Sequence, residues 1–164
     1  MKTTYSFRSV YRPVPNRRLL HRAMNDAADF AGLPVNGDWE FRVWFLDDEA
    51  MAEAHVDIMN VEGTTDVITM AYLEEPEALF PGDMGLELLI CVPFAMREGA
   101  ERDDSSFAEE LMLYLVHGCL HAAGENDLTE EERKSMRKRE AEVMALLREK
   151  YDFEEIFPCC RNCR

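Results

Sequence analysis

The chain has 164 residues and 47% of them are hydrophobic, so we expect a single folded domain and not a disordered segment. Its 33 acidic residues against 18 basic ones give a formal net charge of −15, which argues against general binding of polyanions. No apolar run approaches the roughly 18 residues of a membrane span, and residues 1–8 lack the apolar core of a secretory signal, so we expect a cytoplasmic protein without a membrane partner.

The first part of the chain is predicted to contain two strands and two helices. Asn16 is a helix-capping residue type, Gly32 is a terminating one, and apolar residues between them recur at helical spacing. Apolar and polar residues alternate over 39–46, which is typical of a half-buried strand. In order, we expect an edge strand at 3–11, a helix from Asn16 to Phe30, a strand at 39–46 and a helix from Asp47 to about Met59.

The rest of the chain changes from strands to helices. Thr129 is followed by three Glu, which resembles a capping box at the start of a helix. In order, we expect a strand at 66–72, a Pro- and Gly-containing loop at 74–85, a strand at 86–92, a long helix from Ser105 or Ser106 to His121, and a helix from Thr129 through Leu147.

Mixed strands followed by helices indicate the α+β class. We predict a single domain over residues 1–158, in which a small mixed sheet packs with helices on one side. Of the five Cys, Cys91 and Cys119 lie in apolar segments and are expected to be buried thiols. The tail at 159–164 is interpreted as a frayed, reduced end; its three thiols, Cys159, Cys160 and Cys163, could also hold a metal, but no fourth ligand is nearby.

The most informative stretch has the spacing His117-x-x-x-His121-x-x-Gly124-x-x-Asp127. Residues four apart on a helix lie on the same face, so both imidazoles can reach one cation. Gly124 can adopt a positive φ, end the helix and turn the chain so that Asp127 approaches the same ion. Three protein ligands plus an open position are typical of a catalytic zinc site.

Each of these residues also has a structural interpretation. A single His in an apolar helix is more often a hydrogen-bonded core residue than a ligand, but two at this spacing, with a Gly and an acid at set offsets, favour a metal site. Asp127 could instead be a turn or capping residue, and Glu125 competes with it as the third ligand.

The spacing is similar to that of the metzincin peptidases, with one departure. Those enzymes carry a Glu directly after the first His, where it acts as the general base. In this chain that residue is Gly118, which has no carboxylate. The sequence therefore disfavours a metalloprotease.

Two stretches match the motifs of another family. His117-Gly-Cys-Leu-His121 followed by Gly124 matches H-G-x-L-H-x-x-G, and residues 65–69, Thr-Asp-Val-Ile-Thr, match T-D-V-L-S/T. Residues 86–91 fit a third motif, with Glu87 where an Asp is usual. Over about residues 35–145 the chain thus resembles the YbeY family, the bacterial rRNA maturation endoribonucleases.

The chain departs from that family at several positions. The family's third His falls on Asp127 and the Asp before it falls on Asn126. Asp is a competent oxygen ligand for zinc, although a harder one that tolerates other divalent ions better. An Arg that is thought to face the RNA phosphate falls on Met59, and an Asn of the same helix falls on His55.

The resemblance implies a metal-dependent, single-strand-specific endoribonuclease that acts in rRNA maturation and ribosome biogenesis. It implies one Zn²⁺, or another divalent ion, held by His117, His121 and Asp127, and partners that are single-stranded RNA, rRNA precursors and ribosomal particles. The residue that acts as general base is not identified. Binding of single-stranded RNA needs positively charged side chains. The candidates form a basic cluster early in the chain, namely Arg12, Arg17, Arg18 and Arg22. A solvent-exposed helix face would explain the same cluster equally well.

Two other functions stay open. One is a ribosome-associated maturation factor that keeps the metal for stability and has little nuclease activity, which Met59 and the acidic charge favour. The other is a metallohydrolase of another substrate, such as a peptide.

Overall fold

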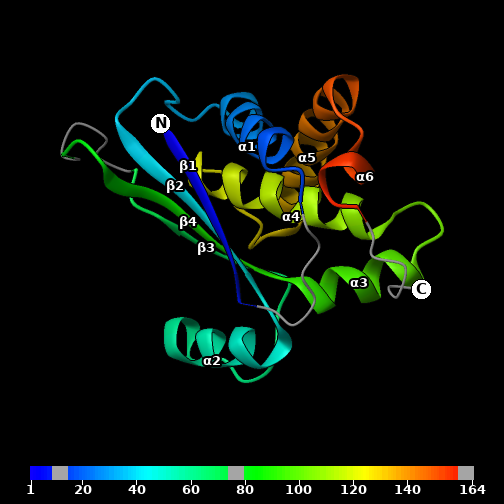
Figure 1. Cartoon of the computed structure of the whole chain (residues 1–164). Helices are drawn as coiled ribbons and strands as arrows, with labels where there is room; N and C mark the ends of the chain where they lie inside the picture. Colours follow the sequence, from blue (N-terminus) through cyan, green and yellow to red (C-terminus); the bar gives the residue numbers. More distant parts are fainter. Residues whose placement is uncertain (9–14, 74–79, 159–164) are drawn as a thin grey trace.

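The computed structural model describes residues 1–8, 15–73 and 80–158 as an α+β domain, the predicted class (Figure 1). Its strands are β1 (Lys2–Arg8), β2 (Trp39–Leu46), β3 (Val67–Ala71) and β4 (Asp83–Cys91). Its helices are α1 (Arg17–Ala31), α2 (Asp48–Met59), α3 (Val92–Glu101), α4 (Phe107–Ala122), α5 (Glu130–Lys150) and α6 (Phe153–Ile156). Residues 9–11 of the first predicted strand, residues 74–79 of the loop predicted at 74–85, Arg12 and the Cys-rich tail lie outside the described residues.

The four strands form one mixed sheet, as the sequence predicts, and their order is β1-β2-β4-β3. β1 and β4 both pair with β2 in parallel, whereas β3 runs antiparallel to β4. β1 is therefore an edge strand, as expected, and β3 forms the other edge. An edge strand leaves the backbone groups of its outer side without a strand partner, and this matters for β3 because the candidate site lies beside it.

Most of the helices cover one face of the sheet. The alternation of β2 turns Phe41, Val43 and Phe45 to this face, where they are fully buried in one core cluster with residues of α1, α4, α5 and α6. The aromatic and aliphatic side chains of this layer form the main core. Both expected buried thiols, Cys91 and Cys119, are buried.

Helix α2 is the exception to the expected arrangement, because it packs on the opposite face of the sheet (Figure 1). Its Met51 is fully buried against Leu46, Ile68 and Leu89, which are the outward-facing residues near the ends of three strands. These strand ends are apolar on both faces, so the second face needs a cover there, and α2 supplies it.

Candidate metal centre and groove

Helix α4 carries both motif His in its last turns, as the sequence predicts. The Ser106 side chain caps its N-terminus by accepting a hydrogen bond from the Glu109 backbone N–H. At the other end Gly124 has φ +98°, and its N–H donates to the His121 carbonyl. This positive φ ends the helix and reverses the chain, which confirms the role expected of Gly124.

The reversal brings Asp127 to the two imidazoles. The Nε2 atoms of His117 and His121 are 3.0 Å apart, and the Asp127 Oδ2 atom lies 4.0 and 3.8 Å from them. Within the described residues these three form the one group of His, Cys, Asp or Glu side chains whose ligand atoms converge closely enough to hold a metal ion. The side chain of Glu125, the competing third ligand, lies instead 3.8 Å from the guanidinium of Arg139.

Each imidazole is oriented by a partner on its other nitrogen. The Nδ1–H of His117 donates to the Glu140 carboxylate at 2.7 Å, and the Nδ1–H of His121 donates to the Glu125 carbonyl at 2.9 Å. Both rings therefore have a lone pair on Nε2 in their neutral form, and these lone pairs face each other. Such an arrangement is repulsive unless a cation or a proton lies between the two nitrogens, so it favours a cation site.

The pKa of His117 is raised. Burial alone would lower the pKa, but the hydrogen bond and charge of Glu140, together with the charges of Asp66 and Asp127, outweigh that effect. A more basic imidazole is a stronger ligand, and it also holds a proton more tightly when no metal is bound.

The donor set fits a small divalent ion. Zn–N bonds of about 2.0–2.1 Å at tetrahedral angles separate two ligand nitrogens by about 3.3 Å, close to the distance between the two imidazoles. The Asp127 carboxylate must move inward by roughly half an ångström to complete the set. Its side chain is 39% exposed, which leaves room for this shift.

The loop that carries Asp127 is held by helix α5. Arg133 donates to the carbonyls of Asp127 and Leu128 at 3.2 and 2.9 Å. Thr129 and Glu132 form the capping box that the sequence predicts. Asp127 is therefore held in place by residues that lie within ten positions of it in the sequence. Glu140, the partner of His117, lies further along α5, and the sequence did not predict its role.

The three residues form one wall of an open groove of about 380 Å³ beside the edge strand β3. Helix α4 borders the groove from one face of the sheet and helix α2 borders it from the other. Apart from His117, His121 and Asp127, the groove is lined by His55, Met59, Thr65, Val67, Ile68, Thr69 and Ala71. Two of the positions that depart from the family pattern, His55 and Met59, thus line the same groove as the metal ligands.

Gly118, which separates this chain from the peptidases, has a packing role. A Cβ atom on Gly118 would lie 2.8 Å from Leu88 Cδ1 and 3.1 Å from Thr69 Oγ1, and Leu88 is fully buried. Helix α4 therefore crosses β3 and β4 too closely for a side chain at this position. The side of α4 that bears a Glu in the peptidases here faces the sheet.

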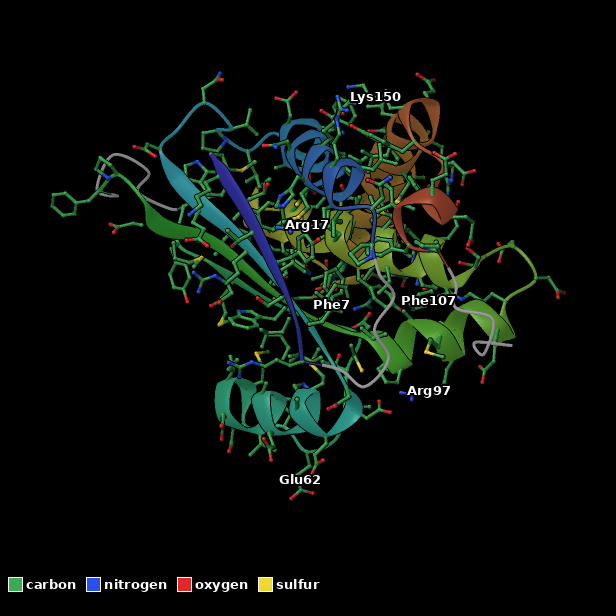
Figure 2. The ribbon with its side chains drawn as sticks, in the orientation of Figure 1. Phe7, Arg17, Glu62, Arg97, Phe107 and Lys150 are labelled. Carbon is green, nitrogen blue, oxygen red and sulfur yellow. The ribbon has the colours of Figure 1, made fainter. Side chains whose placement is uncertain are left out.

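Three of the four arginines predicted to contact RNA lie elsewhere on the molecule, and the fourth, Arg12, is outside the described residues. Arg17, Arg18 and Arg22 are exposed on α1. This helix packs on the side of β1, the edge strand opposite β3, and Figure 2 labels Arg17 on it. Arg17 lines a separate hollow with Thr4, Tyr5 and His21. None of these three lines the groove, and their contact with RNA stays a prediction.

The chain is similar to proteins of a known family. A family model described as "Endoribonuclease YbeY" matches residues 9–148. A protein of that name from Chlamydia abortus is 38% identical over 111 residues, which are 66% of this chain and 70% of that protein. Another, from Halalkalibacterium halodurans, is 31% identical over 134 residues, 77% of this chain and 82% of that protein.

A solved structure shares the fold. The solution structure of TM1509 from Thermotoga maritima has a TM-score of 0.54 and 20% sequence identity, and the match covers 97% of this chain and 99% of that one. At this identity the likeness concerns the fold alone.

Proposed function

This chain belongs to the endoribonuclease YbeY family, and from that premise we propose that it is a metal-dependent, single-strand-specific endoribonuclease that acts in rRNA maturation. The observation that carries the proposal is the pair of facing imidazole Nε2 atoms beside the Asp127 carboxylate, at the wall of an open groove. Partners on both Nδ1 atoms support a ligand role over a structural one.

We assign one zinc ion per chain to His117, His121 and Asp127. A divalent ion bound there supplies Lewis acidity toward a phosphoryl oxygen and lowers the pKa of a bound water. The protein's own groups orient the site: Glu140 and the Glu125 carbonyl fix the imidazoles, and Arg133 fixes the loop of Asp127. Because one ligand is a carboxylate, manganese or another harder ion is expected to replace zinc more readily than at a three-His site.

The groove favours a single strand over a duplex. The groove runs beside the edge strand β3 and is bordered by α2 and α4, and the metal ligands form one of its walls. An RNA backbone must therefore enter the groove to place one phosphate beside the ligands. A flexible single strand can do this more easily than a stiff A-form helix.

We propose single-stranded rRNA precursors and ribosomal particles as partners, with Arg17, Arg18 and Arg22 contacting RNA outside the groove. We also propose a cytoplasmic location. Within the described residues, no helix is both long and apolar enough to cross a bilayer.

The proposal is tested by cleavage of a labelled RNA. Metal-free protein is incubated with a single-stranded RNA or the same RNA in a duplex, with and without one equivalent of Zn²⁺ or Mn²⁺. We expect cleavage of the single strand only when metal is added, and none with His121→Ala. Equal cleavage with and without metal, or equal cleavage by His121→Ala, would contradict the assignment.

A second function is supported by one observation, the absence of any Lys or Arg among the described residues that line the groove. With Met59 at the position of a phosphate-facing Arg, the site could hold a metal for stability in a ribosome-associated factor with little activity. A protein that binds one equivalent of metal and co-sediments with ribosomal particles, yet cleaves no RNA, would favour this function.

A further inference from the structure

The described lining of the groove contains one residue outside the metal ligands that can exchange a proton near neutral pH. Met59, Val67, Ile68 and Ala71 are apolar, and Thr65 and Thr69 carry hydroxyls that do not ionise in this range. The remaining residue is His55, and histidine is the side chain that most often transfers protons in catalysis. Within the described lining, His55 is therefore the one candidate for a proton-transferring side chain in this groove outside the metal ligands.

The orientation of His55 suits this role. Its Nδ1–H donates to the Gly63 carbonyl at 2.9 Å, and Gly63, with φ +95°, lies in the turn that follows α2. This hydrogen bond ties one ring nitrogen to the backbone and leaves Nε2 for a substrate. The bond is retained whether or not Nε2 carries a proton, since a carbonyl accepts from both forms of the ring.

The position of His55 is opposite the metal ligands. His55 belongs to α2, whereas His117 and His121 belong to α4, and the two helices lie on opposite faces of the sheet (Figure 1). All three side chains line one groove beside the edge strand β3. In a phosphoryl displacement the attacking and leaving oxygens lie roughly in line on opposite sides of the phosphorus. If water attacks from the side of α4, the leaving ribose oxygen faces the side of α2.

We propose that His55 is the general acid of the reaction, a role that rests on the nuclease function proposed above. A water oxygen forms the new bond to phosphorus, the bond from phosphorus to the leaving oxygen breaks, and the proton on His55 Nε2 passes to that oxygen. The proton released by the attacking water goes to solvent, and His55 regains one from solvent. The sum is hydrolysis of one phosphodiester, with no further reactant.

A simpler role for His55 is electrostatic, as a cation that binds an RNA phosphate in place of the Arg that Met59 replaces. The two roles differ in what they do to the leaving group. A general acid is needed for an oxygen leaving group and is dispensable when sulfur replaces that oxygen, because a thiolate leaves without protonation. A phosphate-binding cation contributes equally to both substrates.

The experiment compares the wild type with His55→Asn on two single-stranded RNAs, one natural and one with sulfur at the bridging position of the leaving oxygen. The product termini of the wild-type reaction decide which bridging position to replace. Bound metal and the RNA dissociation constant are measured for both proteins. Asp57→Asn is the matched control, because Asp57 is exposed on the same helix α2 but does not line the groove.

We expect His55→Asn to keep its metal and its RNA affinity and to cleave natural RNA about 10²–10⁴-fold more slowly than wild type in single turnover. On the sulfur-containing RNA its rate should lie within about threefold of wild type, because protonation no longer limits the reaction. Equal losses on both substrates, a loss only in RNA affinity, or no loss on natural RNA would each overturn the role of His55 while leaving the nuclease function intact. A metal-loaded wild type that cleaves no RNA would overturn the nuclease function itself.

Discussion

Replacing Glu140 by Gln tests whether the imidazole network serves a metal. Glu140 accepts the Nδ1–H of His117 at 2.7 Å, and the side chains are only 17% and 22% exposed. Gln keeps an oxygen that can accept this hydrogen bond but removes the negative charge. The ring should therefore stay in place while its Nε2 becomes a weaker ligand.

The expected magnitude follows from the type of bond that is lost. A hydrogen bond to a charged group contributes about 1.5–3 kcal/mol and a neutral one about 0.5–1.5 kcal/mol, so the exchange costs about 1–1.5 kcal/mol. This corresponds to about a tenfold rise in the zinc dissociation constant, at the lower end of the about 10–100-fold effects seen for partners of metal ligands. Glu140→Ala, which also frees the ring, should approach the upper end.

The assay is competition for zinc against a chromophoric chelator. It is run at pH 8, where a proton on His117 competes least with the metal. The control is Glu142→Gln on the same helix, because Glu142 is more exposed and pairs with Arg139 away from the imidazoles. Equal zinc affinity in Glu140→Gln and Glu142→Gln, with both proteins folded by circular dichroism, would refute a role of Glu140 in metal binding.

Three further predictions concern the ligands, the helix packing and pH. Asp127→Ala should weaken zinc binding by at least about tenfold in the same competition assay; unchanged affinity would shift the third ligand to Glu125 or water. Gly118→Ala should lower the free energy of unfolding by about 1 kcal/mol in urea titrations, since overpacking against Leu88 costs about 1–3 kcal/mol and alanine gains about 1 kcal/mol in helix propensity; a more stable variant would contradict the packing. Because the pKa of His117 is raised on folding, its protonation stabilises the metal-free protein below the ordinary pKa near 6.5, and this contribution is lost as pH rises through the raised value. Zinc competes with the same proton, so its affinity should fall by about tenfold per pH unit below the raised pKa of His117; an affinity that does not change between pH 8 and 5 would exclude His117 as a ligand.

Local patterns predicted the parts of the site that depend on local geometry. The His spacing follows from the helical repeat, the positive φ of Gly124 from the freedom of glycine, and the capping box of Thr129 from the side chains of one turn. Together these placed Asp127 near the two imidazoles.

Other parts depend on contacts between distant elements, which no local pattern encodes. Glu140 meets His117 because α5 packs against α4, and His55 enters the groove because α2 packs on the second face of the sheet. Helix α3 was not predicted, since the apolar run of β4 continues into its first turn without a break in pattern. The expectation of helices on one side missed α2 because alternation tells which residues share a face but not which helix covers it.

The central claim is that a metal held by His117, His121 and Asp127 is required for RNA cleavage. The most direct measurement titrates the metal-free protein with Zn²⁺ and follows bound metal and single-strand cleavage in the same samples. The account predicts that the cleavage rate rises in proportion to occupancy and levels off at one equivalent, and that His121→Ala shows neither. A protein that binds no stoichiometric metal, or whose cleavage does not depend on occupancy, would contradict it.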